Sequence, residues 1–92
     1  MLDKKQFYIN GKWIDPIKPK SLEVINPSTE DVCAVISLGS KEDVDVAVNV
    51  AKSALRTWRN TSKEERIDLL EKLLAIYKKR YAEMADAISI EM

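Results

Sequence analysis

The chain has 92 residues, a length that makes one small domain or one part of a larger protein. Its 15 basic and 15 acidic side chains cancel, so no overall field attracts nucleic acid or anionic lipid. It has no histidine, two glycines and one cysteine, which excludes a disulfide framework, a Cys/His zinc site and a glycine-rich phosphate loop within these residues. We therefore expect any enzymatic chemistry to be completed by residues outside this chain.

The first predicted element is a β-hairpin over residues 6–14. Asn10 and Gly11 tolerate the positive φ angles of a type I′ turn, and short apolar runs flank them on both sides. Two prolines then make residues 15–21 a loop or an edge segment, because proline cannot donate a ladder hydrogen bond.

Two further short strands are expected, over residues 22–25 and 32–37. A cluster of turn residues at 26–31 separates them, since Pro27 disfavours helix and the short polar side chains bond locally. The continuous apolar run of residues 32–37 is typical of a strand that is covered on both faces.

Residues 40–92 carry helix signals and contain neither glycine nor proline. Ser40 can accept a hydrogen bond from the backbone N–H of Asp43, which predicts a helix start. An apolar stripe follows at helical spacing, made of Val44, Ala47, Val48, Ala51, Leu55 and Trp58. Ser62 and Glu65 have the spacing of a capping box, so we expect a second helix start where each side chain bonds the other's backbone N–H.

The second helical segment carries a heptad-like seam of apolar residues. Its members are Ile67, Leu70, Leu74, Tyr77, Tyr81, Met84 and Ile88. The seam suggests a coiled coil or a helix that docks in a groove, with Asp68 and Lys72 as a supporting i,i+4 pair. We prefer an amphipathic helix on a globular core, interrupted near residues 79–81, because Leu69, Leu73 and Ile76 widen the apolar stripe.

Few side chains are candidates for chemistry. Cys33 lies in an apolar strand, without the cation or helix N-terminus that would activate a thiol, and is interpreted as structural. The carboxylate pairs at residues 30–31, 42–43 and 64–65 lie at turns or helix starts and are interpreted as solvated. Two large aromatic residues, Trp13 and Trp58, are expected in a core.

The expected compartment is the cytoplasm. No stretch approaches the roughly 20 apolar residues of a membrane span, and residues 1–6 lack the apolar part of a signal peptide. A single cysteine suits a reducing compartment. The basic run at residues 78–80 is interpreted as a solvated helix end, so neither a membrane nor nucleic acid is expected as a partner.

The ordered set of motifs resembles the N-terminal region of the aldehyde dehydrogenase superfamily, over nearly the whole chain. The motifs are Phe7-Tyr8-Ile9-Asn10-Gly11-Lys12-Trp13, Val24-Ile25-Asn26-Pro27-Ser28-Thr29, Val35-Ile36, Lys41-Glu42-Asp43-Val44-Asp45-Val46-Ala47-Val48, residues 51–58, residues 66–74 and Ile88-Ser89-Ile90-Glu91-Met92. Each motif alone is weak, but their order and spacing are specific.

The resemblance implies a full-length NAD- or NADP-dependent enzyme that oxidises an aldehyde to a carboxylic acid. The family's cysteine nucleophile and glutamate base lie far beyond Met92, so no catalytic or cofactor-binding residue carries over and this chain alone is expected to be inactive. The family's monovalent cation site does reach this region. Its positions match Val24, Ile25 and Glu91, which would hold K⁺ or Na⁺ through main-chain oxygens and a carboxylate.

The expected fold class is α+β: an N-terminal hairpin and short antiparallel strands, then two or three amphipathic helices, as a fragment of a larger α/β enzyme. Residues 1–92 would form a single unit, the N-terminal part of a coenzyme-binding domain, with strands in 6–38 and helices in 40–92. The remainder of the dehydrogenase chain is the expected partner, within a homo-oligomer. The alternative is a small helical interaction module that self-associates through residues 67–88.

Overall fold

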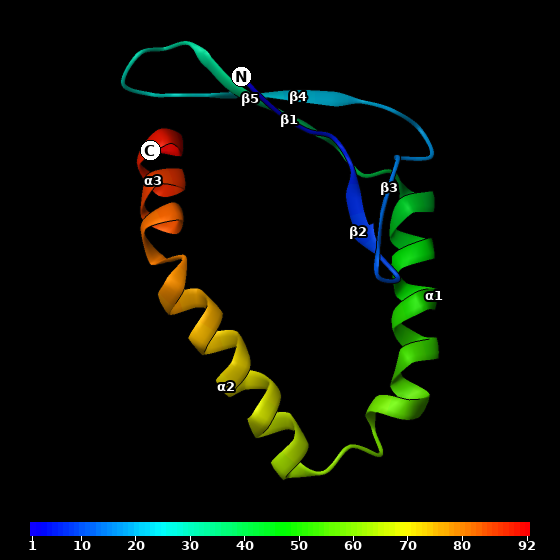
Figure 1. The fold of residues 1–92 in the computed structure, drawn as a ribbon. Coiled ribbons are helices and arrows are strands. Elements are labelled where there is room, and N and C mark those ends of the chain that lie inside the picture. The colour runs from blue at the N-terminus through cyan, green and yellow to red at the C-terminus, as the bar shows by residue number, and fades with distance from the viewer.

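The computed structural model describes residues 1–92 and contains two small β-sheets and three helices (Figure 1). The strands are β1 (Leu2–Lys4), β2 (Phe7–Ile9), β3 (Lys12–Ile14), β4 (Ser21–Ile25) and β5 (Val32–Ser37). The helices are α1 (Lys41–Trp58), α2 (Lys63–Lys79) and α3 (Tyr81–Glu91). The order of strands and then helices confirms the predicted α+β class. No helix is long and apolar enough to cross a membrane.

The β2–β3 hairpin forms as predicted. Asn10 and Gly11 take positive φ angles of 57° and 73°, as the tight turn requires. The register pairs Phe7 with Ile14 and Tyr8 with Trp13. The Tyr8 and Trp13 ring centroids lie 5.1 Å apart, so this pair stabilises the exposed face of the hairpin.

The second sheet has the order β1-β5-β4, with β5 in the centre. The β4–β5 pair is antiparallel as expected, whereas β1 pairs with β5 in parallel. The prediction missed β1, because three residues give no periodic signal and the pairing of Leu2 with Ala34 is distant in sequence. The central strand is only half-buried, so the expectation that it is covered on both faces was wrong for this chain.

The caps of α1 and α2 differ from the prediction in one respect. Ser40 and Asp43 form a complete capping box, in which each side chain accepts from the other's backbone N–H. At α2, Ser62 Oγ accepts from Glu65 N at 3.1 Å, but the return bond from Glu65 is absent, so the predicted reciprocal box is half formed. The difference follows from burial, because Glu65 is exposed to water whereas Asp43 is covered.

Ser40→Ala and Ser62→Ala are expected to weaken the two helices unequally. Loss of either serine cap costs about 1 kcal/mol of helix stability. We expect the larger loss for Ser40→Ala, because Asp43 would also lose the hydroxyl that donates to its carboxylate. Circular dichroism of the two variants tests this prediction, and an equal loss of helicity would contradict it.

The apolar seam does not form one continuous helix. Arg80 leaves helical geometry at φ −105° and ψ 15°, which separates α2 from α3 and confirms the predicted interruption near residues 79–81. Tyr77 and Tyr81 meet edge to face across this break, with centroids 5.9 Å apart, and Arg80 pairs with Glu83 at 2.9 Å. The predicted Asp68–Lys72 pair is present at 3.0 Å.

The structure has no hydrophobic core of its own. Asp43 is the one buried residue, and Trp13 and Trp58 are 66% and 46% exposed, so the prediction of core tryptophans was wrong for this chain. Figure 1 shows an open arch in which α2 and α3 extend away from α1. Every residue of these two helices is exposed, so the preferred prediction of a helix on a globular core was also wrong.

Two global measures agree with the open shape. The accessible surface is 7894 Å², whereas a compact monomer of this mass would expose about 5,400 Å². The radius of gyration is 16.9 Å, against about 12 Å for a compact domain of this length. The excess of about 2,500 Å² is as large as a permanent subunit interface. Apolar faces of this chain therefore need other structure to cover them.

Candidate functional site

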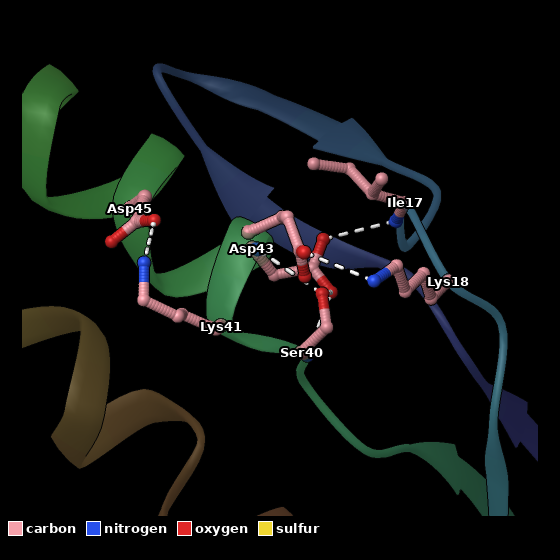
Figure 2. Close-up of polar contacts among 7 residues, drawn as sticks. Ile17, Lys18, Ser40, Lys41, Asp43 and Asp45 are labelled. Carbon is pink, nitrogen blue, oxygen red and sulfur yellow. Dashed lines mark hydrogen bonds and ion pairs between the residues drawn. The ribbon is translucent and has the colours of Figure 1, made fainter.

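The most organised polar group of the chain is the Asp43 carboxylate, in the first turn of α1 (Figure 2). Oδ1 accepts from the Ile17 backbone N–H at 3.0 Å. Oδ2 accepts from both the Ser40 backbone N–H and the Ser40 hydroxyl, each at 2.9 Å. The residue is 5% exposed. We call these three residues, Ile17, Ser40 and Asp43, the Asp43 junction.

These hydrogen bonds set the protonation of Asp43. The Ile17 backbone N–H and then the Ser40 backbone N–H lower the pKa of the carboxyl, against the opposing effect of burial. Because the folded pKa lies below the unfolded value, the stabilisation is fully present above the unfolded pKa and is lost as pH falls through the folded pKa. The carboxylate thus stays ionised at neutral pH, with both oxygens occupied by donors of this chain.

Two exposed ion pairs flank the junction. Lys18 Nζ lies 3.0 Å from Glu42 Oε1, and Lys41 Nζ lies 2.9 Å from Asp45 Oδ2. The bond from Lys18 is the main cause of the lowered pKa of Glu42. Exposed pairs of this kind contribute little stability, so the hydrogen bonds of Asp43 dominate the local energetics.

The interpretation of residues 42–43 as solvated carboxylates was therefore wrong for Asp43. The capping position was visible in the sequence, but the partner from residue 17 was not, because it lies 26 residues away. An ionised carboxylate that is covered and bonded internally is a structural acceptor. At 5% exposure it is not accessible to a substrate proton.

The residues matched to a cation site lie in two places. Val24 and Ile25 are adjacent at the end of β4, beside an irregularity in its pairing with β5. Glu91 is the exposed last residue of α3 and forms no ion pair. The chain has no cluster of three or more His, Cys, Asp or Glu side chains suited to a metal ion.

Cys33 lies next to this region, in the central strand. Its thiol is half-buried and donates to the Val24 carbonyl oxygen, with Sγ 3.3 Å from that oxygen. Val24 is also paired with Ala34 in the β4–β5 ladder. The contact with the β4 backbone supports the structural interpretation of this cysteine.

Fold and site together define a class of protein: an α+β segment with exposed apolar faces that is built to pack against further structure. The sequence model of the aldehyde dehydrogenase family matches residues 13–92. The chain belongs to the aldehyde dehydrogenase family.

Individual relatives give the same result. The chain is 44% identical over all 92 residues to a 3-succinoylsemialdehyde-pyridine dehydrogenase from a Pseudomonas species, of which it covers 19%. A crystal structure of aldehyde dehydrogenase from Bartonella henselae matches the whole chain with 58% identity and a TM-score of 0.98, again over 19% of that enzyme. Aldehyde dehydrogenase C from Pseudomonas syringae, solved with NAD⁺ and octanal, matches 96% of the chain at 42% identity and a TM-score of 0.93.

The chain thus spans about a fifth of the length of its relatives, as an N-terminal region. The relatives contain roughly four times as much further chain as these residues.

Proposed function

We propose that this chain serves as the N-terminal part of an enzyme that oxidises an aldehyde to a carboxylic acid with NAD(P)⁺. The observation that carries the proposal is the match to the Bartonella henselae aldehyde dehydrogenase over the whole chain, at 58% identity and a TM-score of 0.98. The proposed cofactor supplies the hydride acceptor. The relative solved with NAD⁺ supports NAD⁺, and NADP⁺ offers the same chemistry.

The role of residues 1–92 in that enzyme is architectural. We propose that they form one unit, the N-terminal part of the coenzyme-binding domain, in a cytoplasmic homo-oligomer. Gly11 and Gly39 lie too far apart for a dinucleotide-binding turn, and Cys33 is committed to the β4 backbone. The catalytic cysteine, the catalytic glutamate and the nucleotide site would come from the rest of the enzyme.

Incubation of the purified chain with an aldehyde and NAD⁺ tests whether these residues lack catalytic activity of their own. We expect no formation of NADH, with the Bartonella henselae enzyme as the positive control in the same assay. Aldehyde-dependent formation of NADH by the isolated chain would contradict the proposal.

We further propose that Val24, Ile25 and Glu91 contribute to a monovalent cation site. Carbonyl and carboxylate oxygens are suitable ligands for a hard cation, and Val24, Ile25 and Glu91 offer both kinds. In the Bartonella henselae enzyme carrying this chain in place of its matching segment, K⁺ or Na⁺ should raise the melting temperature relative to choline. Glu91→Gln should reduce that rise. Glu71→Gln should not, because Glu71 lies in α2, on the other side of the Arg80 break from Glu91. An equal rise in both variants would contradict the site.

The second candidate function is a self-associating module. The exposed apolar residues of α2 and α3, from Ile67 to Ile88, favour it, because a second copy could cover them. Light scattering on the chain tests this candidate. An oligomer that dissociates in the Leu74→Glu/Tyr81→Glu variant supports it, and a monomer at high concentration rules it out.

A further inference from the structure

Two parts of the chain that are far apart in the sequence meet at the Asp43 carboxylate. One is the connection from β3 to β4 over residues 15–20, which we call the strap, and the other is the start of α1, from its N-cap Ser40 through its first turn. Figure 2 shows Ile17 and Lys18 of the strap facing Ser40 and Asp43. No other carboxylate in the chain bonds backbone donors from two such segments.

The two oxygens of Asp43 accept hydrogen bonds from different parts of the chain. Both bonds from Ser40 end on Oδ2, so the helix cap leaves Oδ1 free, and Oδ1 takes the Ile17 N–H of the strap. Ile17 supplies the first backbone N–H after Asp15, because Pro16 has none. The prolines also limit the conformations of the strap, which reduces the entropy lost when it is held.

We propose that Asp43 is a two-sided latch: one carboxylate oxygen closes the cap of α1, and the other fastens the strap. The strap continues directly from the β2–β3 hairpin and into β4. Fastening it to α1 therefore sets how both sheets lie relative to this helix. The inference is independent of the proposed dehydrogenase activity, because it concerns contacts inside this chain.

The charged groups around the latch are already paired elsewhere. Lys18 bonds Glu42, Lys41 bonds Asp45, and Asp15 accepts from the Gln6 side chain. The Asp43 carboxylate is therefore held by backbone and hydroxyl donors alone. Glu42→Gln is a matched control, because it removes a neighbouring carboxylate charge and the ion pair to Lys18 while keeping the latch.

Amide NMR of the chain during an acid titration tests the latch. The Ile17 and Ser40 amide signals should shift together, with one midpoint below the ordinary aspartate pKa of about 3.9. The shared response should persist in Glu42→Gln and disappear in Asp43→Asn. Independent midpoints, or an Ile17 response that survives in Asp43→Asn, would overturn the proposal.

Hydrogen exchange gives a second readout. In Asp43→Ala we expect the Ile17 amide to exchange about tenfold faster or more, as loss of a hydrogen bond to a charged group implies. Asp45→Ala, two residues further along α1, should leave the rate unchanged. Equal exchange rates at Ile17 in the wild-type chain and in Asp43→Ala would overturn the latch. The wild-type titration stays decisive even if Asp43→Ala fails to fold.

Discussion

The isolated 92-residue chain is expected to show no cooperative unfolding transition of the size of a globular domain in scanning calorimetry. A compact domain of this length would absorb about 64 kcal/mol at its midpoint, in proportion to its residues. That enthalpy comes from buried packing and internal hydrogen bonds, and here no apolar side chain is buried. We expect residual structure in residues 7–50, where nearly all of the half-buried residues lie.

Hydrogen exchange on the same sample separates this expectation from simple disorder. Amides at the Asp43 junction should be protected, whereas those of α2 and α3 should exchange at rates set by helix fraying alone. A sharp calorimetric transition of full size in a monomer would contradict the account. The same transition in an oligomer would instead support the self-associating alternative.

Leu73→Glu is expected to prevent folding of a complete dehydrogenase that carries this chain. Leu73 is 62% exposed here, and we expect the rest of the enzyme to cover it. An unpaired carboxylate at such a position would cost roughly 3 kcal/mol or more. Leucine and glutamate have similar helix propensities, so α2 itself should be little affected.

Ala75→Glu is the matched control for this experiment. Ala75 lies on the polar side of α2, between Glu71 and Lys79, so the same added charge should remain in water. Both variants are made in the Bartonella henselae enzyme with its matching segment replaced by this chain, and soluble yield and melting temperature are measured. Equal stability of the two variants would show that the apolar side of α2 is not an interface.

The local elements could be predicted from the sequence, because their signals are local. Asn10-Gly11 defined the hairpin turn, and Ser40 and Ser62 marked two helix starts within one residue. The break near Arg80 was also expected. The family could be recognised because several weak motifs occur in a fixed order.

Long-range features could not be predicted in the same way. The parallel pairing of β1 with β5 and the bond from Ile17 to Asp43 join residues more than 25 positions apart, with no periodic signal to report them. The exposure of Trp13 and Trp58 was also missed. Apolar patterning shows that a side chain is meant to be covered, but it does not show whether the covering atoms belong to the same chain.

The segment exchange itself tests the central claim most directly, because it asks whether this chain can do the work of the matching fifth of an aldehyde dehydrogenase. We expect the Bartonella henselae enzyme that carries residues 1–92 of this chain to form NADH from an aldehyde at a rate close to that of its parent. The result that would contradict the account is a soluble, folded hybrid enzyme that forms no NADH under conditions in which the parent enzyme is active.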